Sequence, residues 1–201
     1  MDTLLSLFVG LGLSAACGFR LFVPLLMISA ASLAGHMTLA PGFEWIGTWP
    51  ACVAFGVATV LEVAGYYIPC VDNFLDTVAT PAAVVAGTMA TASMVSGMDP
   101  FLKWTVAIIA GGGVAGLIQG ATAVTRATSS LTTGGFLNPV LATAELGGAI
   151  TTSLLSFVAP VLMALILVAV VTAIAIQFWR RRSTVGSAGV NGVVTNSSRR
   201  P

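Results

Sequence analysis

The sequence predicts an all-α integral membrane protein with about six transmembrane helices. Of its 201 residues, 57% are hydrophobic and only 7% are charged, whereas an ordinary soluble domain has about 25% charged residues. A chain with so few charges cannot cover a water-facing surface. Apolar stretches long enough to cross a hydrocarbon core of ~30 Å fill almost the whole chain from Leu4 to Phe178. Composition and segment length therefore both indicate the membrane class.

Turn-like breaks divide the apolar region into six predicted spans. The spans cover residues 3–33, 50–69, 77–97, 104–127, 138–156 and 158–179. The first break, from Gly35 to Trp49, contains Pro41 and Gly42 and is typical of a loop with aromatic residues at the membrane interface. The fifth break, at 156–160, is weak, so a tight hairpin or one bent helix are both open there.

Two helix boundaries have signals of their own. The first segment is longer than one straight crossing needs and is interrupted by glycines and by Pro24. A re-entrant hairpin around Gly18 is therefore an alternative to one long helix. At the third span, Thr80 and Pro81 fit an N-cap followed by a proline at the first helical position.

Basic residues predict the orientation. Three arginines at 180–182 follow the last span directly, and a basic cluster beside a helix end stays on the cytoplasmic side. Six spans then place both termini in the cytoplasm, and the loop with His36 and Glu44 on the outer side of the membrane. The expected divisions are a membrane domain over 1–179 with halves 1–98 and 99–179, and a basic, disordered cytoplasmic tail over 180–201.

A weak internal repeat relates the two halves. Gly10-Leu11, Ala15, Arg20 and Leu25 recur at the same spacing as Gly116-Leu117, Ala121, Arg126 and Leu131. A Glu-x-x-Gly motif at Glu62 recurs at Glu145. Three spans per half predict two inverted three-helix repeats with broken or re-entrant first helices, as in secondary transporters. The alternative is that glycine and alanine only allow the spans to pack closely.

Buried charges are the candidate functional site. Arg20, Glu62 and Glu145 lie near the middle of apolar spans, where each costs about 2.5–3.5 kcal/mol on insertion scales. One hypothesis makes Arg20 and Arg126 the substrate-binding pair, because a guanidinium group suits phosphate or carboxylate, and makes Glu62 and Glu145 proton-coupling groups. The alternative is that these arginines and glutamates form ion pairs that only hold the two halves together.

Two aspartates precede the third span. Asp72 and Asp76 are four residues apart and therefore share one face of a helix. A solvated cytoplasmic rim is the preferred interpretation of Asp72. Asp76 joins the two glutamates as a proton-coupling or ion-pair candidate.

The sequence contains no motif that indicates catalysis or metal binding. Its single histidine, His36, is expected in an exposed loop, and Cys17, Cys52 and Cys70 are too far apart for a metal-binding spacing. It also lacks a basic patch suited to nucleic acid. We therefore expect no enzymatic activity, cofactor, metal or nucleic-acid partner.

Two stretches carry a family resemblance. They are Gly10 to Leu26, which contains Arg20 and Pro24-Leu-Leu, and Glu62 to Ala83, with the pattern Glu-x6-Pro-x2-Asp-x3-Asp-x4-Pro. In these residues the chain resembles the bacterial membrane family catalogued as domain of unknown function family 4126. The resemblance implies a small multi-span protein of a bacterial inner (cytoplasmic) membrane and no particular substrate. The positions that carry the pattern are Arg20, Glu62, Asp72, Asp76 and Pro81.

The leading functional hypothesis is a small proton-linked transporter or flippase-like permease. We expect the protein to lie in the lipid bilayer, and we expect its substrate to be a small anion or a lipid phosphate. One alternative is a non-transporting membrane scaffold or assembly factor whose buried charges are structural. The other is a channel formed by a homo-oligomer.

Overall fold

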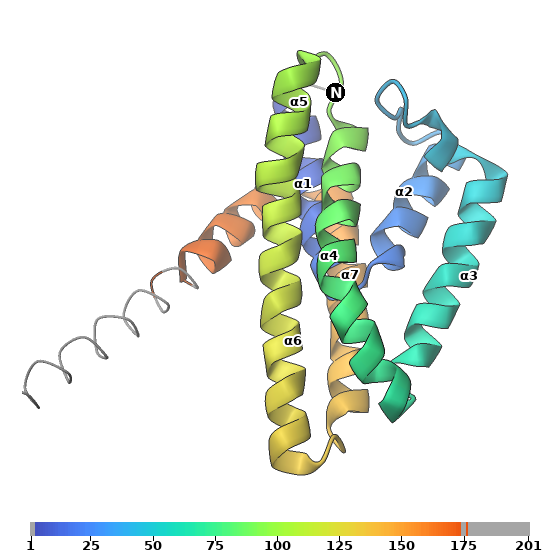
Figure 1. The fold of residues 1–201 in the computed structure, drawn as a ribbon. Coiled ribbons are helices and arrows are strands. Elements are labelled where there is room, and N and C mark those ends of the chain that lie inside the picture. Colours follow the sequence, from blue (N-terminus) through green and yellow to red (C-terminus); the bar gives the residue numbers. More distant parts are fainter. Residues whose placement is uncertain (1–2, 174–175, 177–201) are drawn as a thin grey trace, which may run out of the picture. The chain divides into compact units, whose positions relative to one another are not determined.

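The computed structural model describes residues 3–173 and 176, and all regular structure in them is helical (Figure 1). The chain divides into two units, Met1–Ala164 and Leu165–Pro201, and the helices labelled in Figure 1 belong to the first. The prediction of an all-α chain is confirmed. The predicted tail over 180–201, with the arginines at 180–182, lies outside the described residues.

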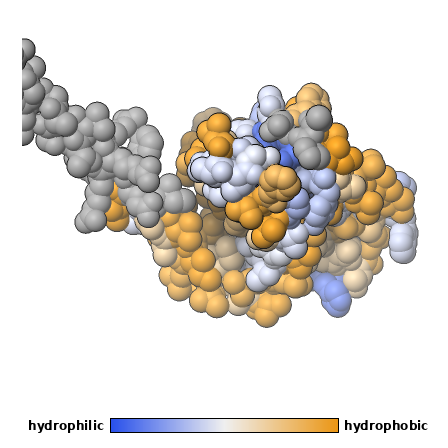
Figure 2. Space-filling model, turned by 90° about the horizontal axis from the view of Figure 1, so that it is seen from below, coloured by the Kyte–Doolittle hydropathy of each residue, from blue (hydrophilic) through white to orange (hydrophobic). Residues whose placement is uncertain are grey.

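Three helical stretches of the described chain are long and apolar enough to cross a membrane. They are Phe74–Met94, Pro100–Thr133 and Asn138–Val158. Shorter apolar helices cover Thr3–Phe19, Phe22–Leu33, Trp49–Gly65 and Pro160–Ala173. Seen from below, hydrophobic residues line much of the outer flank, with more hydrophilic residues toward the middle (Figure 2). The helices therefore indicate a membrane protein, while the count of six spans stays a prediction.

The first predicted span is two helices. Helix α1 covers Thr3–Phe19 and helix α2 covers Phe22–Leu33, and α2 runs back toward the end of the unit where α1 begins (Figure 1). Ser6 near the start of α1 and His36 after α2 line one cavity of about 270 Å³. The first segment is thus a hairpin whose two ends lie at the same end of the unit, while the sides of the membrane on which the termini and the His36 loop lie stay a prediction.

The hairpin turns at Arg20 rather than at Gly18. Gly18 lies inside α1, where an added Cβ would stand 2.7 Å from the carbonyl oxygen of Ala115. Its role is therefore close packing of α1 against the helix that contains Ala115, not a turn.

Helices α3 (Trp49–Gly65) and α4 (Pro69–Met94) follow a short 3-10 turn, η1, at Glu44–Gly47. Helix α4 continues through Pro81 and changes direction along its length (Figure 1), as an internal proline causes by removing a backbone hydrogen bond. The prediction that Thr80 caps this helix is wrong, because Pro69 already supplies the proline of its first turn.

Helix α5 (Pro100–Val106), the π-helical segment η2 (Ala107–Gly112) and helix α6 (Gly113–Thr133) form one helical stretch. Asp99 caps it, since its Oδ1 accepts from the Phe101 amide at 2.9 Å. Glycines of η2 face α4: an added Cβ at Gly112 would lie 2.7 Å from Thr88 Oγ1. Small residues thus let these two helices approach closely.

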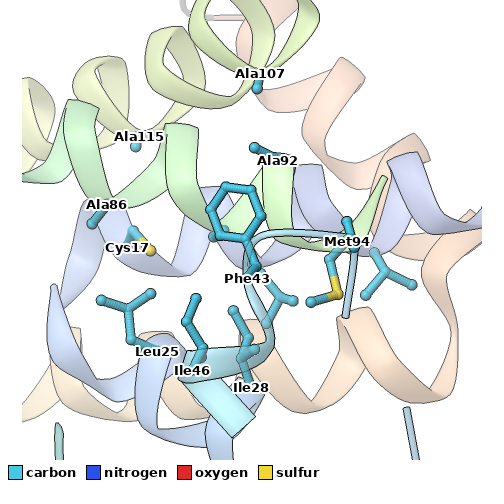
Figure 3. Packing of buried hydrophobic residues seen from close by; sticks show 14 of the residues in the cluster. Cys17, Leu25, Ile28, Phe43, Ile46, Ala86, Ala92, Met94, Ala107 and Ala115 are labelled. Atoms are coloured by element: carbon cyan, nitrogen blue, oxygen red, sulfur yellow. The ribbon is translucent and has the colours of Figure 1, made fainter. Parts of the chain in front are cut away.

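Helix α7 (Asn138–Val158) follows a turn at Gly134 and Gly135, whose φ angles of 63° and 85° suit glycine. The apolar core lies at the other end of the unit, where Phe43 and Ile46 of the loop region pack with Ile28 of α2 and Met94 of α4 (Figure 3). The loop after α2 is therefore fixed by packing as well as by its turns.

The first prediction concerns the ends of the unit. In a background with its three cysteines replaced by alanine, single cysteines at Glu44 and Asp99 should react with an impermeant thiol reagent from the same side of the membrane. A cysteine at Phe136 in the α6–α7 turn should react from the opposite side, because α5 to α6 crosses between them. Labelling in intact cells and inverted vesicles measures this.

The result would contradict the fold if the cysteines at Glu44 and Phe136 reacted from the same side. All three positions are exposed in the structure, so each single-cysteine variant serves as the accessibility control for the other two.

Candidate functional site

Six of the nine charged side chains among the described residues gather at one place in the first unit. We call this group the charge cluster. It consists of Arg20 between α1 and α2, Glu62 of α3, Asp72 and Asp76 of α4, Arg126 of α6 and Glu145 of α7. The remaining charged side chains, Glu44, Asp99 and Lys103, lie in or near loops at the other end.

Arg126 is the centre of the charge cluster. It is 2% exposed, and its Nε donates to Glu145 Oε1 at 2.9 Å. Its Nη1 donates to Asp72 Oδ1 at 2.6 Å, and its Nη2 forms a short ion pair with Glu145 Oε2. Asp76 Oδ1 lies 4.0 Å from Nε. Every guanidinium nitrogen of Arg126 thus has a carboxylate partner.

Arg20 is as deeply buried but is only partly bonded. It is 1% exposed, and its Nη2 donates to the carbonyl oxygen of Ala142 at 2.8 Å and lies 3.5 Å from Glu145 Oε2. Its Nε and Nη1 have no hydrogen-bond partner among the residues that the structure describes. Since a guanidinium group has five N–H donors, Arg20 has free donors inside the protein.

Tyr66 joins the two arginines. The guanidinium carbon of Arg20 lies 3.9 Å from the centre of the Tyr66 ring, and that of Arg126 lies 4.1 Å from it. A cation over an aromatic ring is attracted by the negative face of the ring, more strongly where water is excluded. The sequence analysis missed Tyr66, although its spacing of four from Glu62 placed it on the same helix face.

Glu62 supports the start of α2. Its Oε1 accepts from the Leu21 amide at 2.8 Å and its Oε2 accepts from the Phe22 amide at 3.1 Å. The first amides of a helix have no partner within the helix and carry partial positive charge. Glu62 therefore stabilises the helix that begins immediately after Arg20, while the direct ion pairs of Arg20 and Arg126 involve other carboxylates.

Asp72 is an interior residue, so the predicted solvated rim is wrong. It is buried, and its Oδ2 accepts from Asn138 Nδ2 at 2.8 Å while its Oδ1 binds Arg126. The cause of the error is the position of the helix start: because α4 begins at Pro69, Asp72 lies in its first turn and faces α6 and α7. Asn138, a neutral residue at the start of α7, was not a sequence candidate.

A cavity of about 430 Å³ extends from the charge cluster toward the α6–α7 turn. It is lined by Tyr66, Tyr67, Asp72, Ser130, Gly134, Gly135, Phe136, Asn138 and Pro139. The cavity therefore includes Asp72 and Tyr66, both direct neighbours of Arg126. The described residues contain no group of three or more His, Cys, Asp or Glu side chains arranged to hold a metal.

The pairs that suggested an internal repeat have unequal surroundings. Arg20 and Arg126 meet at one ring, but among the described residues carboxylates contact all three nitrogens of Arg126 and one nitrogen of Arg20. Glu145 binds arginine, whereas Glu62 binds backbone amides. The inverted repeat stays a prediction.

Apolar helices around a buried charge cluster indicate the class of helical membrane proteins with a polar interior. Within that class, the chain belongs to the family described as Domain of unknown function (DUF4126), which matches residues 7–181. No curated protein and no solved structure shows significant similarity to the chain.

The second prediction concerns the stability of the cluster. Replacing Arg126 with Met should lower the free energy of unfolding by about 3–5 kcal/mol, because it leaves buried carboxylates without a counter-charge. Adding Asp72→Asn and Glu145→Gln to the same protein should restore part of this loss. Lys103→Met, which removes a cation outside the cluster, is the matched control.

Thermal unfolding of purified protein in detergent measures these effects. Equal losses for Arg126→Met and Lys103→Met, or no recovery in the triple variant, would show that Arg126 does not hold the cluster together.

Proposed function

We propose that the protein is a small proton-linked permease for an anionic or phosphate-bearing substrate in a bacterial cytoplasmic membrane. The observation that carries the proposal is the buried guanidinium of Arg20, which has two nitrogens without a partner in the described part of the chain. Six spans in two inverted halves and cytoplasmic termini belong to the same proposal. It assigns no catalytic chemistry to the chain.

The free donors of Arg20 support an anionic substrate. A buried donor without a partner costs about 1–3 kcal/mol, and more when the group is charged. A phosphate or carboxylate offers two oxygens in the geometry that a guanidinium fork matches. Arg126 has less capacity, because each of its three nitrogens already donates to Asp72 or Glu145. We therefore assign direct substrate binding to Arg20, with Arg126 able to take part more fully when it releases a carboxylate.

The shared use of Glu145 supports the link to protons. Glu145 Oε2 pairs with Arg126 and also lies 3.5 Å from Arg20, so its charge influences both arginines. Protonation of Glu145 would weaken both interactions and leave more guanidinium donors for an anion. Asp76 is placed to take over as a partner of Arg126, since its Oδ1 is 4.0 Å from Nε.

The position of Arg20 in the fold is consistent with this mechanism. Arg20 lies at the break between α1 and α2, and broken helices form the binding sites of many secondary transporters. Glu62 holds the start of α2 beside it. A change in the charge of Glu62 would therefore act on the helix that follows the binding residue.

A non-transporting scaffold is the second candidate. It is favoured by the carboxylate partners of all three Arg126 nitrogens, which join α4, α6 and α7 as a purely structural ion pair would. The two candidates differ in what they require of Arg20. A permease needs its unpaired donors to bind the anion, whereas a scaffold does not need them.

The third prediction tests transport directly. Purified protein in liposomes should take up at least one of inorganic phosphate, short monocarboxylates or a fluorescent lipid phosphate, with proton movement followed by a trapped pH dye. Arg20→Gln should lower uptake at least ~10-fold, since it removes the charge that binds the anion. Glu145→Gln should keep the protein folded but abolish the pH dependence of uptake, and Glu44→Gln, an exposed acid, should behave as wild type.

The permease is rejected if wild-type protein moves no member of this panel and Glu145→Gln also rescues the stability lost in Arg20→Ala. That pair of results describes a structural ion pair and favours the scaffold.

A further inference from the structure

The cavity at the α6–α7 turn has the size of a small-molecule site. Its volume of about 430 Å³ lies within the range of roughly 300–1,000 Å³ that is usual for ligand pockets. Its walls come from the turn after α3, the first turn of α4, the end of α6 and the start of α7 with the turn between them at Gly134 and Gly135. The cavity is thus formed by parts of the chain that are far apart in sequence.

Asn138 provides an acceptor that no described residue uses. It is 8% exposed, and its Nδ2 donates to Asp72 Oδ2 at 2.8 Å and to Ser130 Oγ at 3.1 Å. A carboxylate only accepts hydrogen bonds, so this contact fixes which end of the amide faces Asp72. Asn138 Oδ1 is then buried without a donor, and a donor supplied from the cavity would satisfy it.

The charge around the cavity favours a cation. Within the described residues, the charge cluster has four carboxyl groups and two guanidinium groups. The charged side chain in the cavity wall is Asp72, and neither arginine is part of that wall. A positively charged ligand would therefore reduce the excess of acidic groups that the cluster contains.

Aromatic rings provide the remaining wall. Tyr67 and Phe136 line the cavity, and Phe136 is 88% exposed. An exposed phenylalanine beside a buried carboxylate suits a ligand with an ammonium group on an apolar body, because the ring attracts the cation and packs against the body.

We infer that this cavity is a binding site for a small organic ammonium ion, whose N–H groups donate to Asn138 Oδ1 and Asp72 while its apolar body lies against Tyr67 and Phe136. The site goes beyond the permease function and does not depend on it. Its ligand has the opposite charge to the anion assigned to Arg20.

The fourth prediction compares three probes that share one ring. Purified full-length protein in detergent is titrated calorimetrically with benzylammonium, benzyl alcohol and benzoate. Benzylammonium should bind at least ~10-fold more tightly than benzyl alcohol, because only the ammonium complements Asp72, and benzoate should not bind. The measurement needs no transport, so its failure is distinct from failure of the permease.

Two variants locate the probe. Phe136→Ala removes an exposed ring that makes none of the cluster's ion pairs, and should weaken benzylammonium binding roughly fivefold. Phe101→Ala, the same substitution at an exposed ring outside the cavity, should leave the affinity unchanged. Asn138→Leu should weaken benzylammonium binding at least ~10-fold by removing the acceptor. If the Asn138→Leu protein does not fold, the result for Phe136→Ala decides whether the cavity is the binding site.

The inference is overturned by any of four outcomes. Equal affinity for benzylammonium and benzyl alcohol would describe an apolar cavity with no charge preference, and tighter binding of benzoate would describe an anion site. Equal losses for Phe136→Ala and Phe101→Ala, or no binding of benzylammonium, would show that the cavity is not its site.

Discussion

The arrangement of α4, α6 and α7 depends on the guanidinium group of Arg126. These helices have largely apolar surfaces, and apolar surface does not drive helices together when the surrounding solvent is lipid. Association must then come from close packing and from polar contacts. The glycines of η2 allow the close packing, and Arg126 provides the polar contacts, with Asp72 from α4 and Glu145 from α7. Because the three nitrogens bind in a fixed plane, they also set the register of the helices.

The break at Arg20 is a second consequence of satisfying polar groups in an apolar setting. A chain that stops one helix and starts another leaves backbone amides without partners, and such groups are expensive away from water. The carboxylate of Glu62, on α3, accepts hydrogen bonds from two of these amides and so stabilises the turn between α1 and α2. The turn also places Arg20 against the ring of Tyr66, which Arg126 contacts as well.

The charged members of the site could be predicted because a charge inside an apolar stretch is conspicuous. Tyr66 and Asn138 could not, since neutral polar residues occur throughout such helices and only their neighbours make them part of a site. The α1–α2 hairpin was open as an alternative, but glycines that serve packing, such as Gly18, resemble glycines that serve turns. Asp72 was misplaced because Pro81 looks like a first-turn proline, and nothing local distinguishes it from a proline inside a bent helix.

Glu145 has two arginines as neighbours, and this sharing constrains how the chain can evolve. A substitution at Arg126 alters the environment of Arg20 through the carboxylate between them, so neither arginine can change independently. During evolution, residues of the charge cluster must then be replaced together rather than by single neutral substitutions. Among homologous sequences, Arg20, Asp72, Arg126 and Glu145 should covary as one group, whereas the apolar positions around them exchange freely.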